Sequence, residues 1–152
     1  MKVEKVLRAA PDEFFGVIEH SLRYEIEKYG GKAEGTYELC EGFCYDKKIR
    51  YKKKEYRMQT ELKAFRPPHS YRVLMKSDLG NASVSYEILP NGEDEIRVIY
   101  REDTCDEDGN MNTSFGRELF GKMQAGRVKR RLSRMEKYIR SQIKCRMGMG
   151  YP

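Results

Sequence analysis

Residues 55–77 read EYRMQTELKAFRPPHSYRVLMKS, and this stretch decides the fold of the chain. From Tyr56 to Ala64 uncharged side chains alternate with charged or amide ones, and the alternation resumes from Tyr71 to Met75. A period of two is typical of β-strands that have one buried face and one wet face. The intervening Pro67-Pro68-His69 is too short to hold a crossover helix. Two antiparallel, neighbouring strands are therefore predicted.

The same pattern extends in both directions along the chain. It predicts strands at residues 43–49, 55–66, 70–77, 82–89 and 95–103. Short clusters rich in Gly, Pro, Asn and Asp separate the last three of them, as expected for hairpins. The sheet is therefore predicted to be an antiparallel meander with one apolar and one polar face. Four tyrosines are predicted on its apolar face, namely Tyr56, Tyr71, Tyr86 and Tyr100.

The N-terminal part predicts a strand over residues 2–9 and then a helix over residues 11–29. Pro11 suits the first turn of a helix, and apolar side chains recur after it at steps of three and four residues. Gly30-Gly31 ends the helix. Residues 32–42 fit a short helical turn and a strand equally well.

A long amphipathic helix is predicted at the C-terminal end, over residues 114–144. Its apolar stripe runs through Leu119, Met123, Val128, Leu132, Met135, Ile139 and Ile143. Three glycines in its first half, Gly116, Gly121 and Gly126, weaken the helix or let it flex. The length of 152 residues suits one domain, predicted over residues 1–146, with a flexible tail at 147–152.

This order of elements predicts an α+β fold in which the long helix covers the apolar, concave face of a curved sheet. It resembles the helix-grip fold of the START-like (SRPBCC) superfamily, which includes the Bet v 1-like proteins. The resemblance covers nearly the whole chain and rests on the element order and on four local patterns, at residues 3–15, 42–47, 83–88 and 98–102. More closely, the chain looks like a set of small uncharacterised bacterial proteins of that superfamily.

The resemblance implies a cavity between sheet and C-terminal helix that holds an apolar or amphipathic small molecule. The residues predicted to line it are Tyr56, Met58, Met75, Tyr86, Tyr100 and Met123. A buried tyrosine hydroxyl needs a hydrogen-bond partner, and methionine adapts to an irregular cavity. The alternative interpretation is that these side chains simply fill a core.

Positive charge is concentrated near the C-terminus, where residues 115–146 hold eleven basic and two acidic side chains. A second basic run, residues 47–54, is interleaved with tyrosines. Basic groups among aromatic rings suit phosphate contact and base stacking. The alternative function is therefore a protein that binds nucleic acid or another polyanion through this hairpin and the basic helix, although solvated surfaces would look the same.

Other chemistry finds little support in the sequence. The pair Cys40 and Cys44 lacks a second Cys or His pair that would complete a zinc site, and His20 and His69 are isolated. No nucleophile stands in a recognised catalytic motif, so no catalytic residue, metal or cofactor is predicted and a binding protein is favoured over an enzyme. The N-terminus lacks the apolar core of an export signal, which predicts reduced cysteines in the cytoplasm.

Overall fold

The computed structural model describes residues 1–105 and 125–147 of the chain. Six strands and two helices follow one another in this part of the chain. In order, they are β1 (Lys2–Leu7), α1 (Pro11–Lys28), β2 (Cys44–Tyr51), β3 (Lys54–Arg66), β4 (Ser70–Ser77), β5 (Gly80–Pro90), β6 (Ile96–Cys105) and α3 (Ala125–Arg146).

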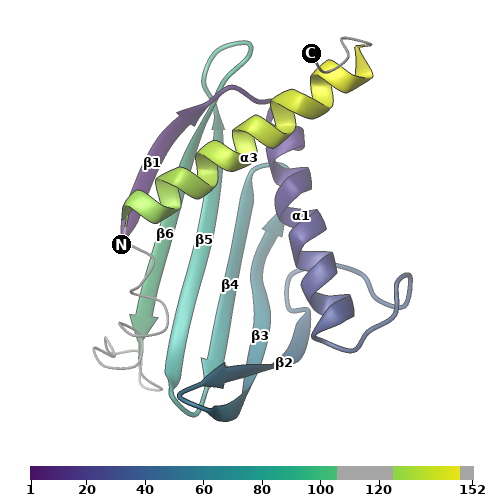
Figure 1. The fold of residues 1–152 in the computed structure, drawn as a ribbon, viewed down its shortest axis with the longest axis vertical. Helices are drawn as coiled ribbons and strands as arrows, with labels where there is room; N and C mark the ends of the chain where they lie inside the picture. Colours follow the sequence, from purple (N-terminus) through teal and green to yellow (C-terminus); the bar gives the residue numbers. More distant parts are fainter. Residues whose placement is uncertain (106–124, 148–152) are drawn as a thin grey trace.

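All six strands form one antiparallel sheet in the order β1-β6-β5-β4-β3-β2 (Figure 1). Strands β2 to β6 follow one another as a meander, which confirms the hairpin pattern of the sequence. The N-terminal strand β1 pairs with β6, in the register Val3 opposite Tyr100. The first and last strands of the chain are therefore neighbours, and β1 and β2 are the two edges.

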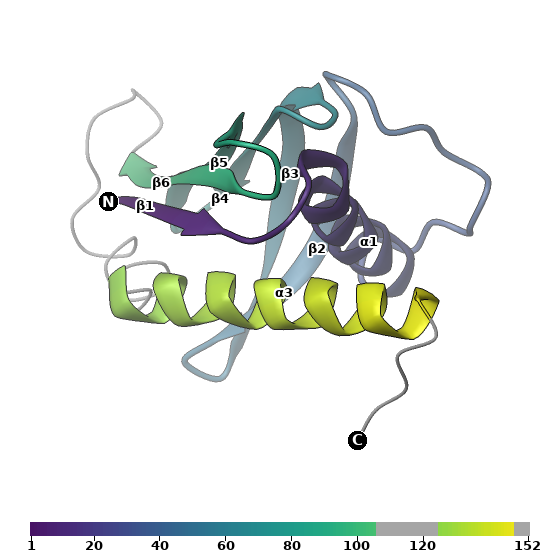
Figure 2. The same ribbon diagram turned by 90° about the horizontal axis from the view of Figure 1, so that it is seen from above.

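Both helices pack on the same, apolar face of the sheet. Figure 1 shows α3 crossing the β1 end of the sheet and reaching the start of α1, and Figure 2 shows the sheet curving around the two helices. The buried side chains of α1 and α3 join those of the strands in one core, with Leu7, Phe14, Ile26 and Leu132 essentially inaccessible to solvent. The predicted helix-grip architecture is thus confirmed, with α1 sharing in the cover of the concave face.

Two details depart from the predicted phase and elements. A bulge between Leu62 and Ala64 shifts the register of β3, so Phe65 takes the inner position opposite Tyr71, and Ala64, predicted inside, pairs with Arg72 on the outer face. Residues 32–42 form neither a helix nor a strand. The predicted start of the C-terminal helix and the end of the predicted tail lie outside the described residues. Neither of the described helices is long and apolar enough to cross a membrane.

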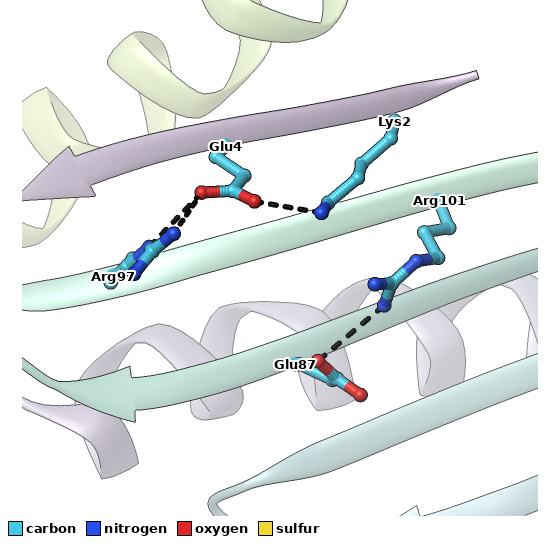
Figure 3. A network of polar contacts seen from close by, with 5 residues as sticks. All are labelled: Lys2, Glu4, Glu87, Arg97 and Arg101. Carbon is cyan, nitrogen blue, oxygen red and sulfur yellow. Dashed lines mark hydrogen bonds and ion pairs between the residues drawn. The ribbon is translucent and has the colours of Figure 1, made fainter.

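Charged side chains cover the outer face of the sheet. Around Glu4 the carboxylate contacts Lys2 Nζ at 2.9 Å and accepts hydrogen bonds from the guanidinium of Arg97, as Figure 3 shows. Arg101 and Glu87 form a further pair at 3.5 Å on β6 and β5. The Arg97 guanidinium and then Lys2 lower the pKa of Glu4 to about 2. The outer face is thus polar, with acidic and basic side chains paired, and the apolar side chains lie on the inner face.

Candidate functional site

A cavity of about 560 Å³ lies between the inner face of the sheet and the two helices. This volume falls within the range of pockets that hold small molecules. Helix α1 forms one wall, strands β2 to β6 form the floor, and α3 contributes Arg131 and Met135. The lining residues are Val17, Ile18, Ser21, Leu22, Glu25, Tyr45, Lys47, Thr60, Tyr71, Val73, Met75, Val84, Tyr86, Tyr100, Arg131 and Met135.

One polar cluster, the Glu25 cluster, joins α1 to β2. Glu25 accepts a hydrogen bond from the hydroxyl of Tyr45 through Oε2 and one from Lys47 Nζ at 2.6 Å through Oε1. Lys47 is only 16% exposed and Glu25 32% exposed, so solvent screens this ion pair less than it screens a surface pair. Each carboxylate oxygen of Glu25 accepts a hydrogen bond, and the charge of Lys47 balances that of Glu25. This cluster therefore needs no ligand to complete its hydrogen bonds or its charge.

A second polar cluster, the Arg131 cluster, joins α3 to β5 and β6. Arg131 donates a hydrogen bond from Nη2 to the hydroxyl of Tyr86 at 2.9 Å, and its Cζ lies 5.2 Å from the centre of the Tyr100 ring. Tyr100 in turn donates a hydrogen bond to Glu102 Oε2 at 2.7 Å. Glu102 is 6% exposed, and burial raises its pKa.

A row of three tyrosine rings links β4, β5 and β6 along the cavity floor. The centroids of Tyr71 and Tyr86 are 6.1 Å apart, and those of Tyr86 and Tyr100 are 5.1 Å apart with an edge-to-face arrangement. These separations favour attraction between aromatic rings. Burial raises the pKa of all three hydroxyls, so they act as neutral hydrogen-bonding groups at neutral pH.

Two buried polar atoms of the lining have no hydrogen-bond partner within the part of the chain that the structure describes. They are Oγ1 of Thr60 and Nε of Arg131. Thr60 is only 2% exposed, and an unpaired buried polar atom costs free energy. Such atoms are uncommon in native interiors, and at a cavity wall they are free to bond a ligand or ordered water.

The structure places the six predicted site residues in three different environments. Met75, Tyr86 and Tyr100 line the cavity. Met58 is buried in the core and Tyr56 is half-buried near the tip of the β2–β3 hairpin, and neither belongs to the lining. Met123 lies outside the described residues.

Several lining residues were absent from the predicted site, and they share a recognisable signal. Glu25 follows Leu22 by three residues on α1, and Arg131 follows Val128 by three on α3. Each therefore stands in the buried stripe of its helix. A charged residue in an apolar stripe was the sequence signal that could have found both clusters.

The remaining sequence candidates lie elsewhere. Cys40, Cys44 and Cys145 are free and exposed. Among residues 1–105 and 125–147, no three His, Cys, Asp or Glu side chains are placed to hold a metal ion. Of the basic run 47–54, Lys47 turns into the cavity wall, and the hairpin tip lies at the opposite end of the molecule from α3 (Figure 1).

Comparison with known proteins places these features in a family. A family described as a domain of unknown function (DUF3284) matches residues 1–121. None of the curated proteins matches the chain.

Solved structures share the fold over nearly the full length. A Rhizobium loti protein is 19% identical with a TM-score of 0.55, and the match covers 85% of this chain and 91% of that one. Truncated norcoclaurine synthase from Thalictrum flavum is 15% identical with a TM-score of 0.54, over 91% of each chain. The same synthase in complex with dopamine and hydroxybenzaldehyde is 14% identical with a TM-score of 0.53, over 93% of this chain and 86% of that one. These neighbours confirm the Bet v 1-like, helix-grip fold.

Proposed function

We propose, from the premise that the chain belongs to the DUF3284 family of domains of unknown function, that it is a non-enzymatic binding protein for an amphipathic small molecule. The ligand occupies the 560 Å³ cavity between sheet and helices. Support comes from one observation above all: the wall of a cavity large enough for a small molecule carries two buried polar atoms, on Thr60 and Arg131, that have no hydrogen-bond partner within residues 1–105 and 125–147.

The composition of the lining also favours binding over catalysis. Tyrosines with a raised pKa are poor bases at neutral pH. Among the described lining residues, Glu25 carries the one carboxylate, and both of its oxygens are engaged, by Tyr45 and Lys47. Apolar side chains such as Val73 and Val84 lie between the two polar clusters, which suits a ligand with an apolar body. The exposed free thiols are consistent with a cytoplasmic location.

The test is to replace a residue of the cavity floor by a larger one, so that the side chain takes the place of the ligand. Met75→Trp adds bulk inside, and Leu74→Trp, the neighbouring residue on the outer face of β4, is the matched control. Protein purified from its own host is examined by native mass spectrometry. We expect a small-molecule adduct on the wild type and on Leu74→Trp that is lost on denaturation and is absent from Met75→Trp. An adduct that persists on folded Met75→Trp would contradict the proposal.

A second candidate, binding of nucleic acid or another polyanion, is favoured by the solvent face of α3. Seven basic side chains are exposed there, Arg127, Lys129, Arg130, Arg134, Lys137, Lys144 and Arg146, and among the described residues Arg146 alone has a carboxylate partner, Glu13. If six or more phosphates are engaged, affinity for single-stranded DNA falls by several powers of ten between about 50 and 200 mM salt. A flat salt response would remove this candidate.

A further inference from the structure

The guanidinium of Arg131 is the one charged group of the described lining that lacks a partner of opposite charge. It lies on the buried side of α3 beside Val128 and Leu132, both fully buried. A guanidinium has five N–H donors, and among the described residues Arg131 donates one hydrogen bond, to the hydroxyl of Tyr86. Nε is buried and makes none within the described residues. Within the described residues, the N–H groups of Arg131 are therefore only partly used.

Arg131 acts on Glu102 electrostatically, since it opposes the rise that burial causes in the pKa of that carboxyl, but it forms no ion pair with Glu102 or with Glu25. Glu102 accepts the hydroxyl of Tyr100, whose ring lies against the guanidinium, and no carboxylate oxygen of residues 1–105 or 125–147 lies within 4.0 Å of Arg131. Glu25 is already paired with Lys47. A half-buried cation without a contacting anion is unfavourable, and within residues 1–105 and 125–147 no carboxylate contacts the guanidinium.

We infer that the ligand is an organic carboxylate with an apolar body, whose carboxylate binds Arg131. This inference rests on the proposed binding function and adds the chemical class of the ligand. A planar guanidinium matches a carboxylate with two parallel hydrogen bonds. The apolar body lies along Val73, Met75 and Val84 on the cavity floor. Arg131 is the one cation of the described lining without an ion-pair partner, and a single cation matches a monoanion, whereas a phosphate dianion would need a second such cation.

The test compares two probes with the same ten-carbon chain, decanoate with its anionic head group and 1-decanol with its neutral hydroxyl, by titration calorimetry on the full chain at neutral pH. We expect decanoate to bind the wild type at least about tenfold more tightly, because hydrogen bonds to a charged group are among the stronger ones. Arg131→Met keeps an apolar stem and removes the charge, so the preference is lost. Arg134→Met, an exposed arginine of the same helix, is the control and keeps it.

The outcomes separate this inference from the proposed function. Two results would overturn the carboxylate assignment and leave the binding function standing. One is equal affinity of the wild type for both probes. The other is an unchanged preference for decanoate over 1-decanol in Arg131→Met. Failure of both probes to bind overturns both proposals. If Arg131→Met does not fold, the comparison of the two probes on the wild type still tests the assignment. Arg131→Lys is then the second variant, because it keeps the charge but loses the two parallel hydrogen bonds. We expect a reduced preference for decanoate over 1-decanol in Arg131→Lys.

Discussion

The carboxyl group of Glu102 is held in surroundings that favour its protonated form. It is almost fully buried and accepts a hydrogen bond from Tyr100. Burial is the largest influence and raises its pKa, while the Tyr100 hydroxyl and Arg131 act in the opposite direction. In the unfolded chain this influence is absent, so the ionised group destabilises the folded state relative to the protonated one.

Glu102→Gln is therefore expected to stabilise the protein modestly at neutral pH. Glutamine keeps an oxygen that can accept the Tyr100 hydroxyl and carries no charge. A raised pKa means that wild-type stability is regained as pH falls through the pKa of the folded state. The difference in unfolding free energy between variant and wild type should thus shrink on acidification, as urea unfolding at pH 4 to 8 would measure.

Glu87→Gln is the control for this series, since Glu87 lies exposed on the outer face, paired with Arg101. An exposed pair contributes little, so this variant should show no comparable gain. A Glu102→Gln protein less stable than the wild type at neutral pH would contradict the argument.

At the scale of elements, helix α1 packs one face into the core and ends at a pair of glycines. Its buried face supplies Phe14, Ile18 and Leu22 to the core and cavity wall. Its end is set by glycines: a Cβ at Gly30 would lie 2.6 Å from the carbonyl oxygen of Ile26, and Gly31 has φ of +68°. In the middle of the helix Gly16 is exposed, with open space where a Cβ would stand.

The two glycines should respond to alanine in opposite directions. Gly16→Ala is expected to raise the unfolding free energy by about 0.5–1 kcal/mol, because alanine loses less backbone entropy in a helix. Gly30→Ala is expected to lower it by about 1–3 kcal/mol, because backbone must shift to relieve the contact. Urea unfolding of both variants measures the pair, and a stabilising Gly30→Ala would show that the end of α1 is packed differently.

At the scale of the whole molecule, the order of elements carried more information than any single residue. Period-two patterns and short breaker clusters predicted every strand to within two residues, because hairpins are local in sequence. The bulge in β3 was not predicted, since it is set by the pairing of β3 with β4 and the small, uncharged Ala64 fits either face of the strand. The cavity was only partly predicted: Tyr86 and Tyr100 followed from strand phase, whereas Arg131 was left out because the basic residues of a surface helix are usually solvated.

Stability of the whole fold should fall at high pH. Burial raises the pKa of Tyr45, Tyr71, Tyr86 and Tyr100. Above pH 10, roughly the reference value for tyrosine, the unfolded chain releases these protons and the folded chain retains them. Each such tyrosine then costs about 1.4 kcal/mol of stability per pH unit.

Phenolate absorbance and far-UV circular dichroism recorded together would test this. We expect one part of the tyrosines to ionise while the structure persists and the rest to ionise together with unfolding. Tyr71→Phe should reduce the second part by one tyrosine. A single ionisation step of all eleven tyrosines without loss of structure would contradict the burial of the row.

The tyrosine row also has an optical consequence. The chain contains no tryptophan, and the three rings of Tyr71, Tyr86 and Tyr100 lie within 6.1 Å of their neighbours, close enough to exchange excitation energy. A tryptophan introduced by Met75→Trp would lie on the same cavity floor and collect that energy. The wavelength of its emission would then report whether water reaches the cavity. No dye is needed, because the wild-type chain has no tryptophan of its own to emit.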